Sequence, residues 1–164
     1  MKNKHLSVLG VGPIYVATIL IVTVVVVILN VKGKLPIYEF PIPLLPILIG
    51  IVLIIVGIIL WISAVVSSKL TAKIKSNELV TNGVFAYVRN PIYSAFMFVC
   101  TGIIFTLNNI FLLIVPLLYW LFLTILLICT EEKWLLNLYT HQYEEYCKKV
   151  NRCIPFFKTK GKNE

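Results

Sequence analysis

Four long apolar runs, separated by shorter polar segments, dominate the pattern of this 164-residue chain. An apolar helix needs about 20 residues to cross a bilayer core of about 30 Å. The runs therefore predict four transmembrane helices, at residues 11–29, 43–66, 91–107 and 110–129, of which the third is short for a span. Because no repeat or long linker divides the chain, we expect one all-α domain over residues 1–164, an integral membrane helical bundle.

The pattern changes after residue 129, where apolar residues recur at helical spacing among charged ones. This apolar stripe consists of Trp134, Leu135, Leu138, Tyr139, Tyr143, Tyr146 and Val150. A helix with one apolar face and one charged face is typical of a membrane surface. We therefore expect a C-terminal cytoplasmic amphipathic helix that serves as a surface anchor, as a lid over a pocket, or as both.

The composition also indicates a membrane protein. Hydrophobic residues make up 59% of the chain and charged residues 13%, whereas soluble domains have about 45–50% and about 25%. A net charge of +8 would suggest nucleic acid in a soluble protein. Here contact of basic residues with anionic membrane lipids explains it better, so no nucleic-acid partner is expected. The cysteines and histidines lack the spacing of a metal site, and no metal is expected.

The lysines and arginines also predict an orientation, because they favour the cytoplasmic ends of membrane spans. With four spans, 13 of the 15 basic residues fall on the side of the two termini. The run at residues 11–29 is longer than a signal-peptide core, so we expect a retained helix. Both termini and both long polar segments are therefore expected in the cytoplasm, and the abundance of Lys, Asn and Ile favours a bacterial plasma membrane.

The third and fourth runs are separated by only Asn108 and Asn109. So short a link predicts an antiparallel hairpin, which places the residues before Pro91 beside those after Cys129. Asn90 is a good N-cap, and Pro91 is a good first-turn residue for the third helix. One end of the hairpin is thus expected to hold two polar segments side by side.

Two charged features lie at this end of the hairpin. Arg89 follows a turn at Asn82-Gly83, either in an ordinary interfacial loop or in a functional site. Glu131 and Glu132 follow the fourth run, and neighbouring helical side chains point about 100° apart, so only one is expected to face the hairpin partner. The pair is either a solvated helix end, with Glu132 bound to a nearby lysine, or a fixed anion for a cationic ligand.

The sequence from Leu79 to Tyr93, LVTNGVFAYVRNPIY, resembles the signature of the isoprenylcysteine carboxyl methyltransferase family. Members of that family are membrane methyltransferases related to the phospholipid methyltransferases. Further features of the family follow in the same order, namely Glu131-Glu132, Tyr143-x-x-Tyr146, Lys148-Lys149 and Ile154-Pro155-Phe156. The resemblance covers residues 77–157, half of the chain.

This resemblance implies an enzyme that uses S-adenosylmethionine to methylate a carboxylate, thiol or amine of a lipophilic acceptor. It implies a cofactor site built from residues 77–93 and 130–157. The implied cofactor-binding residues are Asn77, Glu78, Leu79, Val80, Phe85, Asn90, Pro91, Ile92, Tyr93 and Glu131. Glu131 would meet the amino group of the methionyl part. Arg89 would orient an anionic group of the substrate or, equally, bind a lipid phosphate.

Three positions depart from the family pattern. Asn90 stands where the signature has histidine, and Phe85 stands where it has tyrosine. Leu127 lies near the place of a substrate-contacting arginine in eukaryotic members, so a prenylated cysteine is not clearly implied as the acceptor. Two other hypotheses remain: a non-catalytic membrane protein, such as a small transporter subunit or scaffold, and a family member that binds the cofactor without catalysis.

Overall fold

A computed structural model describes residues 11–66 and 79–155, and these two ranges contain helices without any β-sheet. In chain order the helices are α1 (Gly12–Val31), α2 (Leu44–Val66), η1 (Gly83–Ala86), α4 (Pro91–Thr106), η2 (Ile110–Leu113), α5 (Ile114–Cys129), α6 (Glu131–Tyr139) and α7 (His141–Lys149). The predicted all-α class is therefore confirmed over the described residues.

Three helical stretches are long and apolar enough to cross a membrane: Gly12–Val31, Leu44–Val66 and Ile110–Tyr139. Helix α4 is also apolar, but it has only 16 residues. Three of the four predicted spans thus have a matching helix of sufficient length. Whether α4 crosses the whole bilayer stays a prediction.

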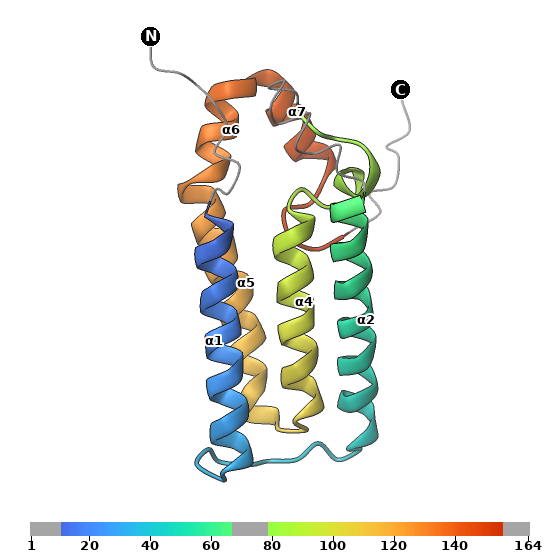
Figure 1. The fold of residues 1–164 in the computed structure, drawn as a ribbon, viewed down its shortest axis with the longest axis vertical. Coiled ribbons are helices and arrows are strands. Elements are labelled where there is room, and N and C mark those ends of the chain that lie inside the picture. The colour runs from blue at the N-terminus through green and yellow to red at the C-terminus, as the bar shows by residue number, and fades with distance from the viewer. Residues whose placement is uncertain (1–10, 67–78, 156–164) are drawn as a thin grey trace.

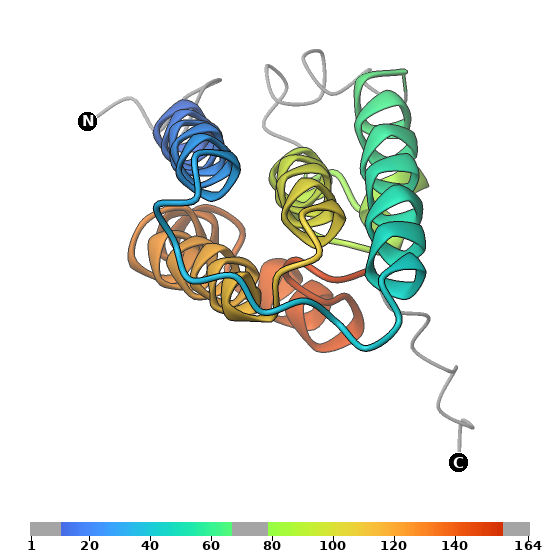
Figure 2. The same cartoon turned by 90° about the horizontal axis from the view of Figure 1, so that it is seen from below.

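The four long helices run side by side, and each is antiparallel to the next along the chain (Figure 1). The starts of α1 and α4 therefore lie at the same end as the ends of α2 and α5. Seen along the bundle, α4 lies between α1 and α2, and α5 lies below α1 (Figure 2). Helices α6 and α7 continue beyond that same end, which becomes the polar end of the molecule.

Glycines set the close packing between α2 and α4. A Cβ atom on Gly50 would lie 2.6 Å from the carbonyl oxygen of Gly102, and one on Gly102 would lie 2.5 Å from the carbonyl oxygen of Gly50. A Cβ atom on Gly57 would lie 2.8 Å from the carbonyl oxygen of Ala95. Without side chains at these positions, the two backbones approach as they do in membrane helix pairs. This packing fixes α4 firmly against α2.

Helices α1 and α5 are joined by larger side chains and a buried polar contact. Tyr15 and Ile19 of α1 are fully buried, as is Leu123 of α5. The hydroxyls of Thr23 and Tyr119 lie 2.7 Å apart, and the Tyr15 hydroxyl donates to the Tyr119 carbonyl at 3.4 Å. The start of α1 is therefore held in a fixed place at the polar end.

Asn109 organises the opposite end of the bundle. Its amide nitrogen donates to Asn30 Oδ1 at 2.9 Å and to the Pro36 carbonyl at 3.0 Å. Its side-chain oxygen accepts from the backbone N–H groups of Tyr38 and Phe111, both at 3.2 Å. The predicted short link thus does more than turn the chain, because it ties the loop after α1 to the hairpin.

The predicted single amphipathic helix is in fact two helices. Thr130 separates α6 from α5 with φ −126° and ψ −85°, and Thr140 separates α7 from α6 with φ +46°. Helix α7 therefore turns back toward the start of α4 (Figure 1). Its residues Tyr143 and Tyr146 are buried and pack against Leu79, so part of the apolar stripe faces protein.

Candidate active site

Four segments that are distant in the sequence meet at the polar end of the bundle. They are the start of α1, the residues on both sides of Pro91, the start of α6, and the chain after α7. The predicted juxtaposition of the residues before Pro91 with those after Cys129 is therefore present. The first segment, at Val11 and Gly12, lies outside every site prediction made from the sequence.

Glu131 binds two neutral hydrogen-bond donors. The hydroxyl of Tyr93, in the first turn of α4, donates to Glu131 Oε1 at 2.8 Å. The backbone N–H of Val11 donates to the same oxygen at 3.0 Å. Within residues 11–66 and 79–155, no lysine or arginine pairs with this carboxylate. Glu131 is thus held in place while its negative charge is not neutralised by a described side chain.

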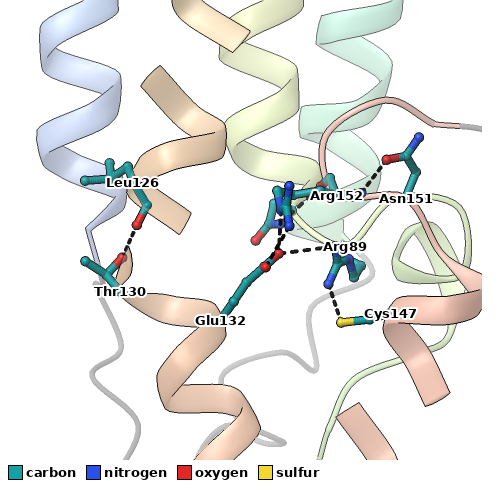
Figure 3. Close-up of polar contacts among 8 residues, drawn as sticks. Arg89, Leu126, Thr130, Glu132, Cys147, Asn151 and Arg152 are labelled. Carbon is teal, nitrogen blue, oxygen red and sulfur yellow. Dashed lines mark hydrogen bonds and ion pairs between the residues drawn. The ribbon is translucent and has the colours of Figure 1, made fainter. Parts of the chain in front are cut away.

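Glu132, by contrast, is neutralised by two arginines (Figure 3). Its Oε1 atom lies 3.2 Å from Arg89 Nη2 and 2.6 Å from Arg152 Nε, and its Oε2 atom accepts from Arg152 Nη2 at 2.9 Å. Among the described residues, the partners of Glu132 are thus two arginines and not the neighbouring lysine, Lys133. As expected, one glutamate contacts the hairpin partner: Glu131 binds Tyr93 of α4, whereas Glu132 binds Arg89 before that helix.

Arg89 is nearly buried among protein groups. Its side chain is 8% exposed, its guanidinium carbon lies 5.9 Å from the ring centre of Tyr143, and Nη1 donates to Cys147 Sγ. The guanidinium therefore has protein partners on several sides, and its binding to a lipid phosphate stays a prediction. Its role in orienting a substrate group stays a prediction.

The chain after α7 completes the site by pairing with the segment before α4. Val88 and Asn151 form an isolated parallel bridge, and the Arg89 N–H donates to the Asn151 carbonyl at 2.9 Å. The Asn90 side chain does not cap α4; its Nδ2 donates instead to the Arg152 carbonyl at 3.1 Å. Asn90 still precedes Pro91 at the helix start, as expected, but its amide serves this tertiary contact.

The remaining predicted cofactor residues fall into two groups. Phe85 and Ile92 pack with the apolar cluster between α2 and the start of α4, and Pro91 is buried there. Leu79 packs against α7, and Val80 beside it is half-buried. Asn77 and Glu78 lie outside the described residues. Among the described members of the predicted set, Tyr93 and Glu131 are joined to each other by a side-chain hydrogen bond.

Burial determines the protonation of the tyrosines and cysteines beside the arginine pair. Desolvation raises the pKa values of Tyr143 and Tyr146 above their usual range, although the charge of Arg89 opposes the shift. It also raises the pKa of the Cys147 thiol, and that of Cys153 to about 12. All four groups are thus neutral at physiological pH. The Tyr146 hydroxyl donates to the Phe85 carbonyl at 2.6 Å, which joins α7 to η1.

Sequence reasoning missed three contributors to this site: Val11, Gly12 and Arg152. Arg152 was counted only as a basic residue of the tail, although it follows the family-like aromatic and lysine run. Gly12-Pro13 is recognisable as a helix start, but nothing in the sequence connects it with Tyr93 or Glu131. These contacts depend on how the helices assemble.

The amino-acid sequence is similar to those of known proteins. A family model described as phospholipid methyltransferase matches residues 45–142, more than half of the chain, so the chain belongs to that family. The chain is also 38% identical over 94 residues to the protein-S-isoprenylcysteine O-methyltransferase of Schizosaccharomyces pombe. That alignment covers 57% of this chain and 38% of the yeast relative. No solved structure matches the chain significantly.

These matches define the class as membrane methyltransferases of the phospholipid and isoprenylcysteine kind. The resemblance recognised in residues 79–93 is confirmed. The family match begins after α1 and ends at residue 142, so Val11, Gly12 and Arg152 lie outside it.

Proposed function

We propose that this protein is an integral membrane methyltransferase that uses S-adenosylmethionine and transfers its methyl group to a lipophilic acceptor. The site lies at the polar end of the bundle, between residues 79–93 and the chain from Glu131 to Pro155. Asn77 and Glu78, together with Leu79, Val80 and Phe85, would line the adenosyl side.

The contrast between the two adjacent glutamates carries this proposal. Glu132 is paired with two guanidinium groups, whereas Glu131 accepts only from a phenol and a backbone N–H among the described residues. S-adenosylmethionine carries positive charge on both its amino group and its sulfonium. A fixed carboxylate without a cationic partner is an apt ligand for such a group, because charge-assisted hydrogen bonds are the stronger kind.

The start of α4 supplies the complementary group for the negative end of the cofactor. A helix start presents free backbone N–H groups that favour an anion. Pro91 has no N–H to offer, so the donors would come from Ile92 and Tyr93. The methionyl carboxylate would then face the start of α4, while the amino group faces Glu131. Tyr93 would contribute to both positions, through its backbone N–H to the carboxylate and through its hydroxyl to Glu131.

The chain's own residues position the reactants and keep water out. When bound, S-adenosylmethionine supplies a methyl group on sulfur; the acceptor's electron pair forms the new bond to this methyl, and the electrons of the broken carbon–sulfur bond stay on sulfur. Tyr93 and Val11 hold Glu131, and α7 covers the site from the side of Leu79. Orientation and exclusion of water are the main contributions expected for such a displacement.

The acceptor is proposed to be a membrane lipid or another hydrophobic molecule. A carboxylate acceptor would need no general base, whereas an amine or thiol would have to lose its proton first. Leu127, near the end of α5, is a fully buried leucine. At that position the chain therefore has no arginine to bind the carboxylate of a prenylated cysteine.

The protein is proposed to expose this site to the cytoplasm. Lys133, Lys148 and Lys149 are exposed at the polar end, whereas the opposite end has Lys32 and Lys34. Alkaline phosphatase fused after residue 164 is expected to be inactive, and the same enzyme inserted between residues 33 and 34 is expected to be active. The reverse pattern would overturn the orientation.

Calorimetry on the detergent-purified protein tests cofactor binding. Wild type is expected to bind S-adenosylhomocysteine, and Glu131→Gln is expected to bind at least about tenfold more weakly. Glu145→Gln is the matched control, because Glu145 is partly exposed and, among the described residues, forms its ion pair with Lys148 on α7. A folded wild type that binds neither S-adenosylmethionine nor S-adenosylhomocysteine would exclude the proposed activity.

Transfer of labelled methyl from S-adenosylmethionine to a total lipid extract then tests catalysis. The expected result is a labelled lipid fraction that depends on Glu131. Binding of the cofactor without any labelled product, in the lipid extract or in a set of hydrophobic acids, amines and thiols, would indicate a member that binds without catalysing.

A further inference from the structure

We propose that the first turn of α1 is part of the cofactor site, with Val11 and Gly12 as positioning residues for Glu131. This inference rests on the proposed function, since it assigns to Glu131 the amino group of the cofactor. It concerns a helix that lies outside the matched family segment, residues 45–142.

The Val11 N–H is available to Glu131 because it precedes the helix. Val11 is the N-cap residue of α1, and its carbonyl accepts the first helical bond, from the Tyr15 N–H at 3.2 Å. The first N–H groups of a helix have no partner within the helix itself. Here that donor reaches Glu131 Oε1 at 3.0 Å, so α1 contributes a fixed dipole to the carboxylate.

The Tyr93 hydroxyl donates to the same oxygen at 2.8 Å. Two donors from different helices restrict the carboxylate to one orientation, because a side-chain rotation that keeps one bond breaks the other. Glu131 is thereby prepared for a cation before the ligand arrives. Such preorganisation lowers the entropic cost of binding.

Gly12 makes room for the Tyr93 ring. A Cβ atom at Gly12 would lie 2.4 Å from Tyr93 Cε1 and 2.8 Å from its hydroxyl oxygen. Both distances are far below van der Waals contact, so any side chain at position 12 would push the tyrosine away. The Tyr93 ring also contacts Tyr15 in a T-shaped arrangement, with ring centres 6.3 Å apart. Tyr15 is itself fully buried, so it limits the space into which the Tyr93 ring could shift.

Two substitutions separate these contributions. Gly12→Ala displaces Tyr93, and Val11→Pro removes the N–H while leaving the space for Tyr93 intact. Val11→Ala loses the same branched side chain but keeps the N–H, so it is the matched partner of Val11→Pro. Gly57→Ala, which crowds α2 against α4 at Ala95 and Val99 without touching Tyr93, reports the effect of a general disturbance of helix packing.

The readout is affinity for two ligands that differ in the group facing Glu131. S-adenosylhomocysteine carries the amino group, and 5′-methylthioadenosine has the adenosyl part without it. Gly12→Ala is expected to bind S-adenosylhomocysteine about tenfold more weakly than wild type, and Val11→Pro about tenfold more weakly than Val11→Ala. Affinity for 5′-methylthioadenosine is expected to stay within about twofold in both comparisons.

The same substitutions in a Glu131→Gln background provide the decisive control. There the losses of affinity for S-adenosylhomocysteine are expected to shrink strongly, since the carboxylate being positioned is gone.

Equal losses of affinity for both ligands, as expected of Gly57→Ala, would overturn the inference and leave the proposed function standing. So would unchanged affinities. A wild type that binds neither ligand would overturn the proposed function itself. If Gly12→Ala does not fold, the Val11 pair alone decides.

Discussion

The Arg89 guanidinium lies 3.2 Å from the Glu132 carboxylate, and this ion pair joins the segment before α4 to the start of α6. Both side chains are nearly buried, with 8% and 12% of their surfaces exposed. Arg152 binds the same carboxylate with two hydrogen bonds, at 2.6 and 2.9 Å. Three segments of the site therefore depend on one carboxylate.

Glu132→Gln is expected to destabilise the folded protein by about 3 kcal/mol, because it leaves two guanidinium groups without an anion at a poorly solvated position. Thermal unfolding in detergent measures this as a lower Tm. Glu145→Gln removes an exposed ion pair with Lys148 and should leave Tm unchanged. Equal Tm values for the two variants would contradict the importance of this pair. Adding Arg152→Gln to Glu132→Gln should recover part of the loss, since one unpaired charge is removed.

The sequence predicted the framework of the site better than its contacts. Apolar runs predict helices directly, and the short link at Asn108-Asn109 predicts that the two ends of the hairpin meet. The predicted third helix, at residues 91–107, differs from α4 by a single residue. The sequence has glycines at 50, 57 and 102 within apolar runs, but only the assembled structure shows that Gly50 and Gly102 lie against each other.

Polar partners could not be predicted in the same way, because they obey no periodicity. Asn90 has a good N-cap identity, yet a tertiary acceptor, the Arg152 carbonyl, takes its side-chain donor. Glu132 has Lys133 beside it in the sequence, yet it binds Arg89 and Arg152. In both cases the side chain binds a group that is distant in the sequence instead of its local partner. The energetic reason is burial, because a buried polar group without a hydrogen-bond partner is costly.

Asn109→Ala is expected to lower the free energy of unfolding by about 3 kcal/mol. Asn109 is 2% exposed, and its loss leaves the Asn30 side chain and the backbone of the loop after α1 without their partners. Buried polar groups without partners cost about 1–3 kcal/mol each. Chemical unfolding followed by tryptophan fluorescence measures the change.

The neighbouring Asn108 is the control for this prediction. Its backbone has φ +50°, a conformation that glycine adopts without steric cost. Asn108→Gly should therefore be as stable as wild type or slightly more stable. If both substitutions destabilise equally, the loss comes from the turn in general and not from the Asn109 hydrogen bonds.

The buried thiol of Cys153 predicts a pH dependence of stability. Desolvation raises its pKa from an ordinary value of 9.0 to about 12, against the opposing charges of Arg152 and Arg89. The folded state then binds a proton that the unfolded state releases, so this contribution is complete below pH 9 and is lost as pH rises from about 9 to about 12. In that range, wild-type stability should fall more steeply than that of Cys153→Ala, by about 1.4 kcal/mol per pH unit.

Alkylation kinetics check the same thiol independently. At pH 8 the raised pKa keeps the Cys153 thiol protonated in the folded state, and its side chain is buried. Mass spectrometry after treatment with iodoacetamide should therefore show Cys153 unmodified under native conditions and modified after unfolding in detergent and urea. Rapid native modification would mean that the chain after α7 leaves the site readily.

Tyr146→Phe is expected to weaken binding of both S-adenosylhomocysteine and 5′-methylthioadenosine by about fivefold. The Tyr146 hydroxyl donates to the Phe85 carbonyl at 2.6 Å, and burial keeps this phenol protonated by raising its pKa. Without the bond, η1 is no longer tied to α7, and Phe85 would line the adenosyl side that both ligands share. Tyr38→Phe, which removes an exposed hydroxyl at the opposite end of the bundle, is the control.

Calorimetry distinguishes the result for Tyr146→Phe from that for Gly12→Ala, which should weaken binding only of the ligand with the amino group. A loss confined to S-adenosylhomocysteine would show that α7 acts on the methionyl side instead.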